Sequence, residues 1–211
     1  MQFSLEELDQ LLKQPAPLRL VKADLSGANL FKVNLAGANL IKADLSGANL
    51  NEADLRGARM SETTLSKADL RRADLTNADL FDANLSEADL SGANLSRAGL
   101  VWANLSGAKL SETNLNETRL SKAKLSGANL SKAALNDTNL SEADLSTVDL
   151  SEANLTGVNL FGADLRGANL FMACLVRTDL NQVRYDRKTI WPEGFDPLAA
   201  RAIFENEQTK K

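Results

Sequence analysis

The sequence predicts an all-β solenoid, a rod in which the chain turns once every five residues. From residue 20 to residue 180 every fifth residue is leucine, apart from Met60. The residue two positions before each leucine is nearly always small, most often alanine. The residue directly before it is Asp or Asn in 24 of the 33 units between residues 18 and 182. Ten of the twelve glycines lie two positions after a leucine.

The five-residue period excludes a helix and a flat strand. On a helix a step of five residues rotates the side chain by about 500°, so the leucines would point in all directions. On a flat strand an odd step alternates faces. A chain that turns once per unit can instead place every leucine inside, and stacked coils then pair their backbones. The leucines and the small residues two positions before them form the expected core.

The glycine positions indicate the kind of turn. A type II turn needs a positive φ at its second central residue, which favours glycine. This explains the ten glycines two positions after a leucine, from Gly27 to Gly167. Where Lys or Glu occupies that position, the sequence predicts a different turn.

Units such as ANLSEADLSGANL, residues 83–95, follow the tandem pattern A(D/N)LXX. The chain therefore resembles the pentapeptide repeat family over roughly four fifths of its length. The segment KTIWPEGFDP, residues 188–197, resembles the C-terminal part of many cyanobacterial members. The resemblance implies a right-handed quadrilateral parallel β-helix with four units per coil, and so about eight coils.

Both ends of the rod are expected to be covered by short helices. Residues 1–17 form an N-terminal helical cap, in which FSLEELDQLLK, residues 3–13, is amphipathic. Residues 18–182 form the β-helix. Residues 183–211 contain an imperfect last coil, a C-terminal helical cap and a tail. The last coil is expected to place Tyr185, Ile190 and Phe195 inward, and the helix to begin at Asp196 with Pro197 in its first turn.

The sequence offers little that could carry out catalysis. It contains no histidine, the commonest general base and metal ligand, and a single cysteine, Cys174. The recurrent Asp and Asn residues are expected to hydrogen-bond neighbouring backbone. The chain is therefore predicted to be a cytoplasmic protein and not an enzyme, with no catalytic residue, no metal site, no cofactor and no membrane segment.

Two functions remain open. The first is a protein-binding or regulatory module with an unknown protein partner, existing as a monomer or weak dimer. The second follows from the resemblance, because some family members mimic DNA, bind a type II topoisomerase such as gyrase and protect it from quinolones. The repeats carry 20 acidic and 17 basic residues, whereas duplex DNA carries one negative charge per about 1.7 Å. Mimicry is therefore the alternative, and the net acidity also disfavours nucleic-acid binding.

Two surfaces are candidates for the partner. If positions 20 residues apart stack, one column of turn residues is unusually apolar, while another consists of serine from Ser26 to Ser146. The apolar column forms the candidate partner surface: Val21, Ile41, Phe81, Val101, Trp102 and Phe161. A structural alternative is that these side chains shield the turns beneath them. A candidate acidic band lies further along the chain: Asp137, Glu142, Asp144, Asp149, Glu152 and Asp164.

Overall fold

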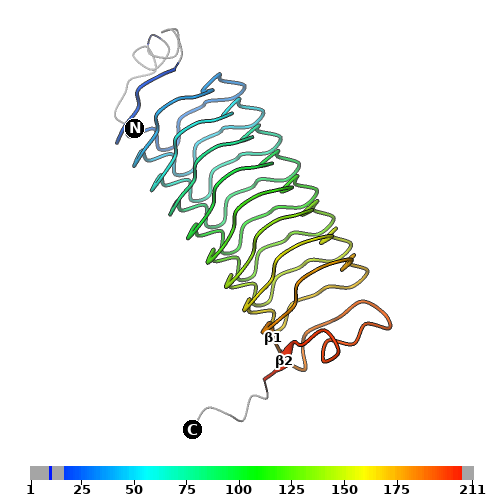
Figure 1. The fold of residues 1–211 in the computed structure, drawn as a ribbon. Coiled ribbons are helices and arrows are strands. Elements are labelled where there is room, and N and C mark those ends of the chain that lie inside the picture. The colour runs from blue at the N-terminus through cyan, green and yellow to red at the C-terminus, as the bar shows by residue number, and fades with distance from the viewer. Residues whose placement is uncertain (1–9, 11–16, 206–211) are drawn as a thin grey trace.

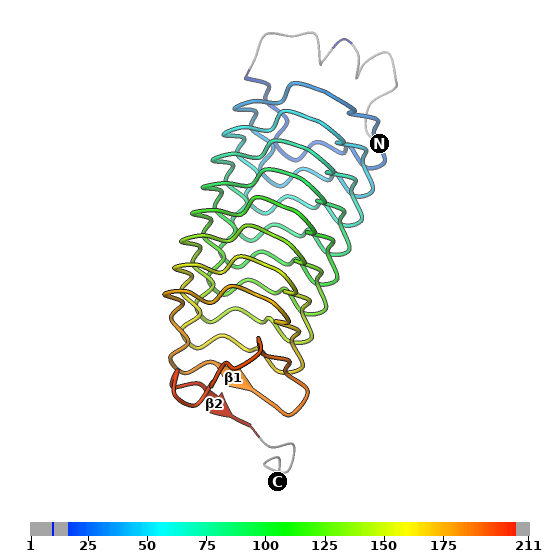
Figure 2. The ribbon, with the colours of Figure 1, turned by 90° about the vertical axis from the view of Figure 1, so that its right-hand side faces the viewer.

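The computed structural model describes residue 10 and residues 17–205, and these form a rod of stacked coils (Figures 1 and 2). Parallel bridges join residues that are 20 apart, as in Arg19 with Asn39 and Asn39 with Arg59. Four five-residue units therefore make one coil, and the cross-section has four sides, as the family resemblance implied. Residues 20 apart lie directly above one another along the rod.

Each unit uses the same hydrogen bonds. In the unit of Leu100, the leucine N–H donates to the carbonyl of Arg119 in the next coil at 2.7 Å. The N–H of Ala103 closes the turn by donating to the carbonyl of Leu100 at 3.1 Å. The N–H of Trp102, inside that turn, donates to the carbonyl of Ser121 at 3.2 Å. Both the sides and the turns of the coil are thus bonded to the next layer.

The prediction of a different turn in units without glycine is wrong. Residues two positions after the leucine have a positive φ in all 33 units, between 62° and 71° for glycine and between 54° and 64° for the others. In most units the N–H group of this residue donates to a carbonyl of the next coil, as Lys42 does to Ser61 at 3.0 Å. This stacking bond needs one turn geometry throughout, so it outweighs the local cost of a left-handed non-glycine residue.

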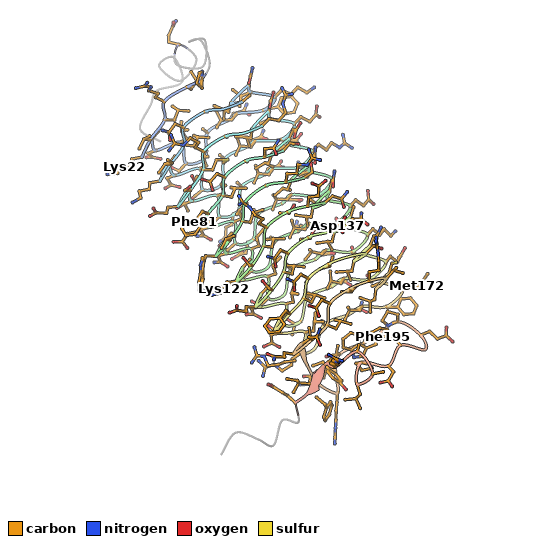
Figure 3. The ribbon with its side chains drawn as sticks, viewed as in Figure 1. Lys22, Phe81, Lys122, Asp137, Met172 and Phe195 are labelled. Carbon is orange, nitrogen blue, oxygen red and sulfur yellow. The ribbon has the colours of Figure 1, made fainter. Side chains whose placement is uncertain are left out.

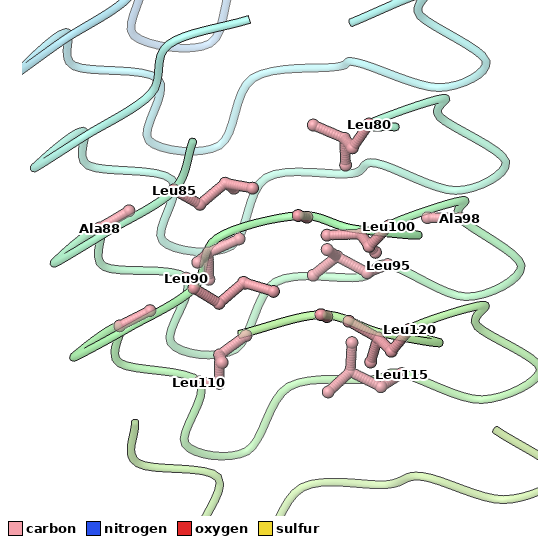
Figure 4. Packing of buried hydrophobic residues seen from close by; sticks show 14 of the residues in the cluster. Leu80, Leu85, Ala88, Leu90, Leu95, Ala98, Leu100, Leu110, Leu115 and Leu120 are labelled. Atoms are coloured by element: carbon pink, nitrogen blue, oxygen red, sulfur yellow. The ribbon is translucent and has the colours of Figure 1, made fainter. Parts of the chain in front are cut away.

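The core is formed as predicted by the leucines and by the small residues two positions before them. Leu80 through Leu100 are fully buried, and so are Ala88 and Ala98 beside them (Figure 4). Threonine replaces alanine at some of these sites and remains buried because its hydroxyl has a partner. Thr113 and Thr118 donate Oγ1 to the carbonyls of Leu90 and Leu95 at 3.1 and 3.0 Å.

Two short strands close the C-terminal end of the rod: β1, Arg184–Tyr185, and β2, Ile203–Phe204, which pair in parallel (Figure 1). The predicted C-terminal helix is wrong. Asp196 does accept the N–H of Leu198 through Oδ1 at 2.9 Å, as a cap would. The chain nevertheless leaves this turn at Arg201, whose φ is 62°, and enters β2. Pairing β2 with the last coil covers an open backbone edge, which a helix would leave unpaired.

The last coil also contains one extra residue. Asn169 bridges to Ile190, an offset of 21, so Trp191 takes the inward position predicted for Ile190, which is exposed. Tyr185 is buried as predicted, and Phe195 is half-buried. The rings of Trp191 and Phe195 stack with centroids 5.2 Å apart, and Tyr185 meets Trp191 edge-on at 5.5 Å. These three aromatic side chains close the core.

The predicted N-terminal helix, residues 3–13, lies outside the described residues except for Gln10. Among the described residues, no helix is long and apolar enough to cross a membrane.

Candidate functional site

The apolar column predicted from the sequence follows one edge of the rod. This edge, called here the Trp102 edge, consists of the two turn residues after positions 20, 40, 60 and so on up to 160. Figure 3 shows Lys22, Phe81 and Lys122 along it, with Asp137 and Met172 on the other side of the rod. Of the six predicted residues, four are exposed and Ile41 and Val101 are half-buried: the exposed four are Val21, Phe81, Trp102 and Phe161.

The centre of this edge is formed by Phe81, Val101 and Trp102. Phe81 and Val101 occupy equivalent positions in adjacent coils, and the N–H of Asp82 donates to the carbonyl of Val101 at 3.0 Å. The side chains of Phe81 and Trp102 are 47 % and 51 % exposed. In the next coil, the Nζ of Lys122 lies 5.1 Å from the centre of the Trp102 ring and 3.6 Å from the carboxylate of Glu142. An apolar spot therefore stands on a ladder of turns whose layers are joined by backbone hydrogen bonds.

The side of the rod next to this spot carries a glycine that the side chain of Arg119 covers. Gly99 lies two residues before Val101, at the position where most units carry Asp or Asn. A Cβ atom added to Gly99 would lie 2.9 Å from Nη2 of Arg119, so the guanidinium of Arg119 extends across the glycine. Asp79, the residue below Gly99, accepts the hydroxyl of Ser61 at 2.8 Å. Charged groups thus flank the apolar spot on both sides along the rod.

The candidate acidic band does not form a single stripe. Asp144 and Asp164 are bridge partners on one side of the rod, while Asp149 lies on the next side and Asp137 on a separate edge. Three of the six acids have basic partners: Glu142 binds Lys122, Glu152 binds Lys132 at 4.0 Å, and Asp164 binds Arg166 and Arg184. The six acids therefore encircle the rod, and half of their charge is neutralised within the chain.

Charged turn residues elsewhere also pair from coil to coil. Among the residues that the structure describes, six such pairs join residues 20 apart, and in each the base precedes the acid in the chain: Lys32–Glu52, Lys42–Glu62, Lys67–Glu87, Arg97–Glu117, Lys122–Glu142 and Lys132–Glu152. Exposed pairs of this kind contribute little stability, but they cancel the charge that the surface presents.

The Asp and Asn residues before the leucines bond to backbone, as predicted. Typically Oδ1 accepts the N–H two residues later, as Asp144 does from Ser146 at 3.0 Å. Cys174 occupies one of these positions, where a hydrogen bond with Thr156 lowers the pKa of its thiol. These carboxylates and amides hold the turns, which accounts for their recurrence without any chemical role.

A hollow of about 500 Å³ lies on the edge opposite to Trp102, above Gly92. Its lining is polar, and two of its charged side chains already form ion pairs: Glu52 binds Lys32 at 3.3 Å, and Arg71 binds Asp69 at 2.7 Å. Within the described residues no group of His, Cys, Asp or Glu has the arrangement of a metal site.

The repeats match the family model for pentapeptide repeats in eight copies, over residues 19–57, 58–97, 103–141 and 143–183, about three quarters of the chain. The chain belongs to the pentapeptide repeat family. Pentapeptide repeat proteins form right-handed quadrilateral β-helices, which agrees with the four-sided coils found here. No curated protein is similar enough in sequence to count as a match.

Several solved structures resemble this pentapeptide repeat protein. HetL, from the cyanobacterium Nostoc sp. strain PCC 7120 and involved in heterocyst differentiation regulation, is 28 % identical, with 92 % of this chain and 99 % of HetL covered and a TM-score of 0.48. Full-length QnrB1, a plasmid-mediated fluoroquinolone resistance protein, is 16 % identical, with 82 % and 87 % covered and a TM-score of 0.60. At that identity the likeness to QnrB1 shows the fold alone.

Sequence reasoning did not single out Asp79 and Asp82, which lie one coil before Trp102. Counting charges in 20-residue windows would have revealed them, because residues 78–97 hold four acids and one base.

Proposed function

We propose that this pentapeptide repeat protein is a non-enzymatic scaffold that binds a protein partner through the Trp102 edge. The observation that carries the proposal is the exposure of Phe81 and Trp102 on a ladder of turns whose layers are joined by backbone hydrogen bonds. Because the backbone beneath these apolar side chains is already ordered, binding loses little backbone entropy there, which suits the side chains to contact another protein. The absence of histidine and the structural use of the carboxylates support a role without catalysis.

The proposal is tested by the double substitution Phe81→Ser with Trp102→Ser. We expect affinity purification from the native cell, read by mass spectrometry, to lose the proteins captured by the parent while the melting temperature stays unchanged. Both side chains are about half exposed, so their loss opens no core cavity. A lowered melting temperature with capture intact would show instead that these residues only shield the turns.

DNA mimicry is the less supported function, because the surface charge is largely cancelled. Pairs such as Lys32–Glu52 at 3.3 Å and Arg97–Glu117 at 3.0 Å place a base beside an acid along the axis. A duplex instead presents uninterrupted negative charge. We therefore expect the purified protein neither to inhibit gyrase supercoiling at low micromolar concentration nor to protect gyrase from a quinolone. Clear protection in that assay would favour mimicry over the scaffold function.

A further inference from the structure

We propose that two copies of this chain associate side by side and antiparallel, with the Trp102 edges in contact and a two-fold axis passing beside Trp102. The inference rests on the proposed function, since it uses the same surface, and it identifies the partner of the centre of that surface as a second copy. Three observations support it: the distribution of charge about Trp102, the symmetry of the residues on either side, and the unpaired charges there.

Charge is distributed with opposite sign on the two sides of Trp102. The coil before it, residues 78–97, holds four acids and one base: Asp79, Asp82, Glu87, Asp89 and Arg97. The coil after the one that carries Trp102, residues 118–137, holds four bases and one acid: Arg119, Lys122, Lys124, Lys132 and Asp137. The apolar spot therefore lies at a boundary between an acidic coil and a basic coil.

A two-fold axis relates such a surface to itself. In an antiparallel pair the axis lies in the interface, perpendicular to the rods, so a residue one coil above Trp102 faces the residue one coil below it on the other copy. Arg119 then faces Asp79 of the partner subunit, because both lie on the side that contains Gly99. Lys122 faces Asp82 of the partner subunit on the edge itself. Each pairing occurs twice, which gives four opposite-charge contacts around Trp102 from both copies.

Two apolar residues of the edge follow the same symmetry. Ile41 and Phe161 lie 60 residues before and after Val101, which is three coils in either direction. Ile41 of one copy would therefore lie opposite the partner subunit's Phe161. At the centre, the guanidinium of Arg119 occupies the space that a side chain at position 99 would take, so a basic group lies beside the axis. Within the predicted apolar column the match is thus confined to Ile41 with Phe161 and to the centre, because Phe81 would lie opposite the partner subunit's Ser121 and Glu62 opposite the partner subunit's Glu142.

The charged groups needed for this contact are available. Within the part of the chain that the structure describes, neither Asp82 nor Arg119 has an ion-pair partner, in contrast to the six base–acid pairs on the rod's edges. The Nζ of Lys122 lies over Trp102 and can turn outward from it, since Glu142 holds it only at 3.6 Å. A parallel pair is disfavoured, because it would place the basic coil against itself and the acidic coil against itself.

The experiment exchanges the charges between two variants. We expect the parent to show a concentration-dependent monomer–dimer equilibrium in analytical ultracentrifugation. Asp82→Lys places lysine opposite Lys122 of the partner subunit, and Lys122→Asp places aspartate opposite the partner's Asp82. Each variant alone should therefore dimerise at least tenfold more weakly. When the two are mixed in equal amounts, both contacts become attractive again, and a heterodimer should form with about the parental affinity.

Asp137→Lys is the matched control, because it changes the same charge at the same turn position on another edge, and it should leave dimerisation unchanged. Melting temperatures of the monomeric variants establish that they are folded. A parent that remains monomeric at several hundred micromolar, or a mixture that does not restore the dimer, would overturn the proposal. In that case loss of partner capture in the Phe81→Ser, Trp102→Ser variant would still support the scaffold function with another protein as partner.

Discussion

Replacing Leu100 with aspartate is expected to unfold the protein or to lower its melting temperature severely. Leu100 is fully buried and lies in a column of leucines from the adjacent coils (Figure 4). A carboxylate there would have no hydrogen-bond donor within the apolar core, and a buried uncompensated charge costs about 4 kcal/mol or more. Because neighbouring coils bury their leucines against each other, the damage should extend to the layers above and below.

Leu100→Met is the matched control, since it keeps an apolar side chain of similar volume and should cost less than about 1.5 kcal/mol. Thermal unfolding followed by far-ultraviolet circular dichroism compares the two. An aspartate variant that melts within a degree or two of the parent would contradict the inward position of this column.

Asp164→Ala is expected to loosen the C-terminal end of the rod. The Asp164 side chain is 7 % exposed and binds the Nε of Arg166 at 2.8 Å and Nη2 of Arg184 at 3.1 Å. Both arginines also approach Glu205, directly after β2, at 3.1 and 4.0 Å. Losing Asp164 leaves these partly buried guanidinium groups with one anion, at a cost of about 2 kcal/mol.

The cost of Asp164→Ala should depend on pH. Burial raises the pKa of Asp164, but hydrogen bonds from Arg166 and the charges of both arginines outweigh it, so the pKa is lowered on folding. A carboxyl group with a lowered folded pKa contributes its full stability above the unfolded pKa of about 3.9, and that contribution is lost as the pH falls through the folded value. The difference in unfolding free energy between parent and variant should therefore shrink below pH 4.

Asp144→Ala provides the comparison, because Asp144 lies directly before Asp164 on the same side and accepts hydrogen bonds from Ser146 alone in its own unit. Its loss should cost less. Urea unfolding at pH 7 and at pH 3 measures both variants. An equal cost at the two pH values would show that the Asp164 carboxylate does not hold the end together.

The repeat region could be predicted from sequence because nearly every unit carries the same residue types at the same positions. The leucine and alanine positions identified the core, and the Asp and Asn positions identified the backbone hydrogen bonds. The turns at Lys22 and Glu52 could not be predicted, because hydrogen bonds to the next coil impose their left-handed backbone. Local conformational preferences do not reflect such bonds between residues far apart in the sequence. The end at residues 186–205 was mispredicted for a similar reason: Asp196 and Pro197 do suggest a helix, but pairing with the last coil decides the outcome.

The candidate site was only partly accessible from sequence. Stacking positions 20 apart placed Phe81, Val101 and Trp102 together, because the register of the repeat is fixed. That Arg119 extends across Gly99, or that Glu142 and Glu152 are neutralised by lysines one coil earlier, depends on side-chain conformations. The repeat pattern of the sequence does not determine these side-chain conformations on an exposed surface. The net charge that each edge presents could therefore be found only from the structure.

The constant offset of 20 residues has a consequence for how this gene can change in length. Losing or gaining a whole coil leaves every later residue on its original edge and changes only the distance between groups on the same line. Losing five residues keeps each leucine inside, so the fold survives, yet it rotates everything downstream by a quarter turn. Such a deletion between residues 85 and 95 would move Trp102 away from the line of Phe81. Insertion or deletion of single units can thus move surface residues to a different edge of the rod without affecting folding, so selection for folding would not remove such changes.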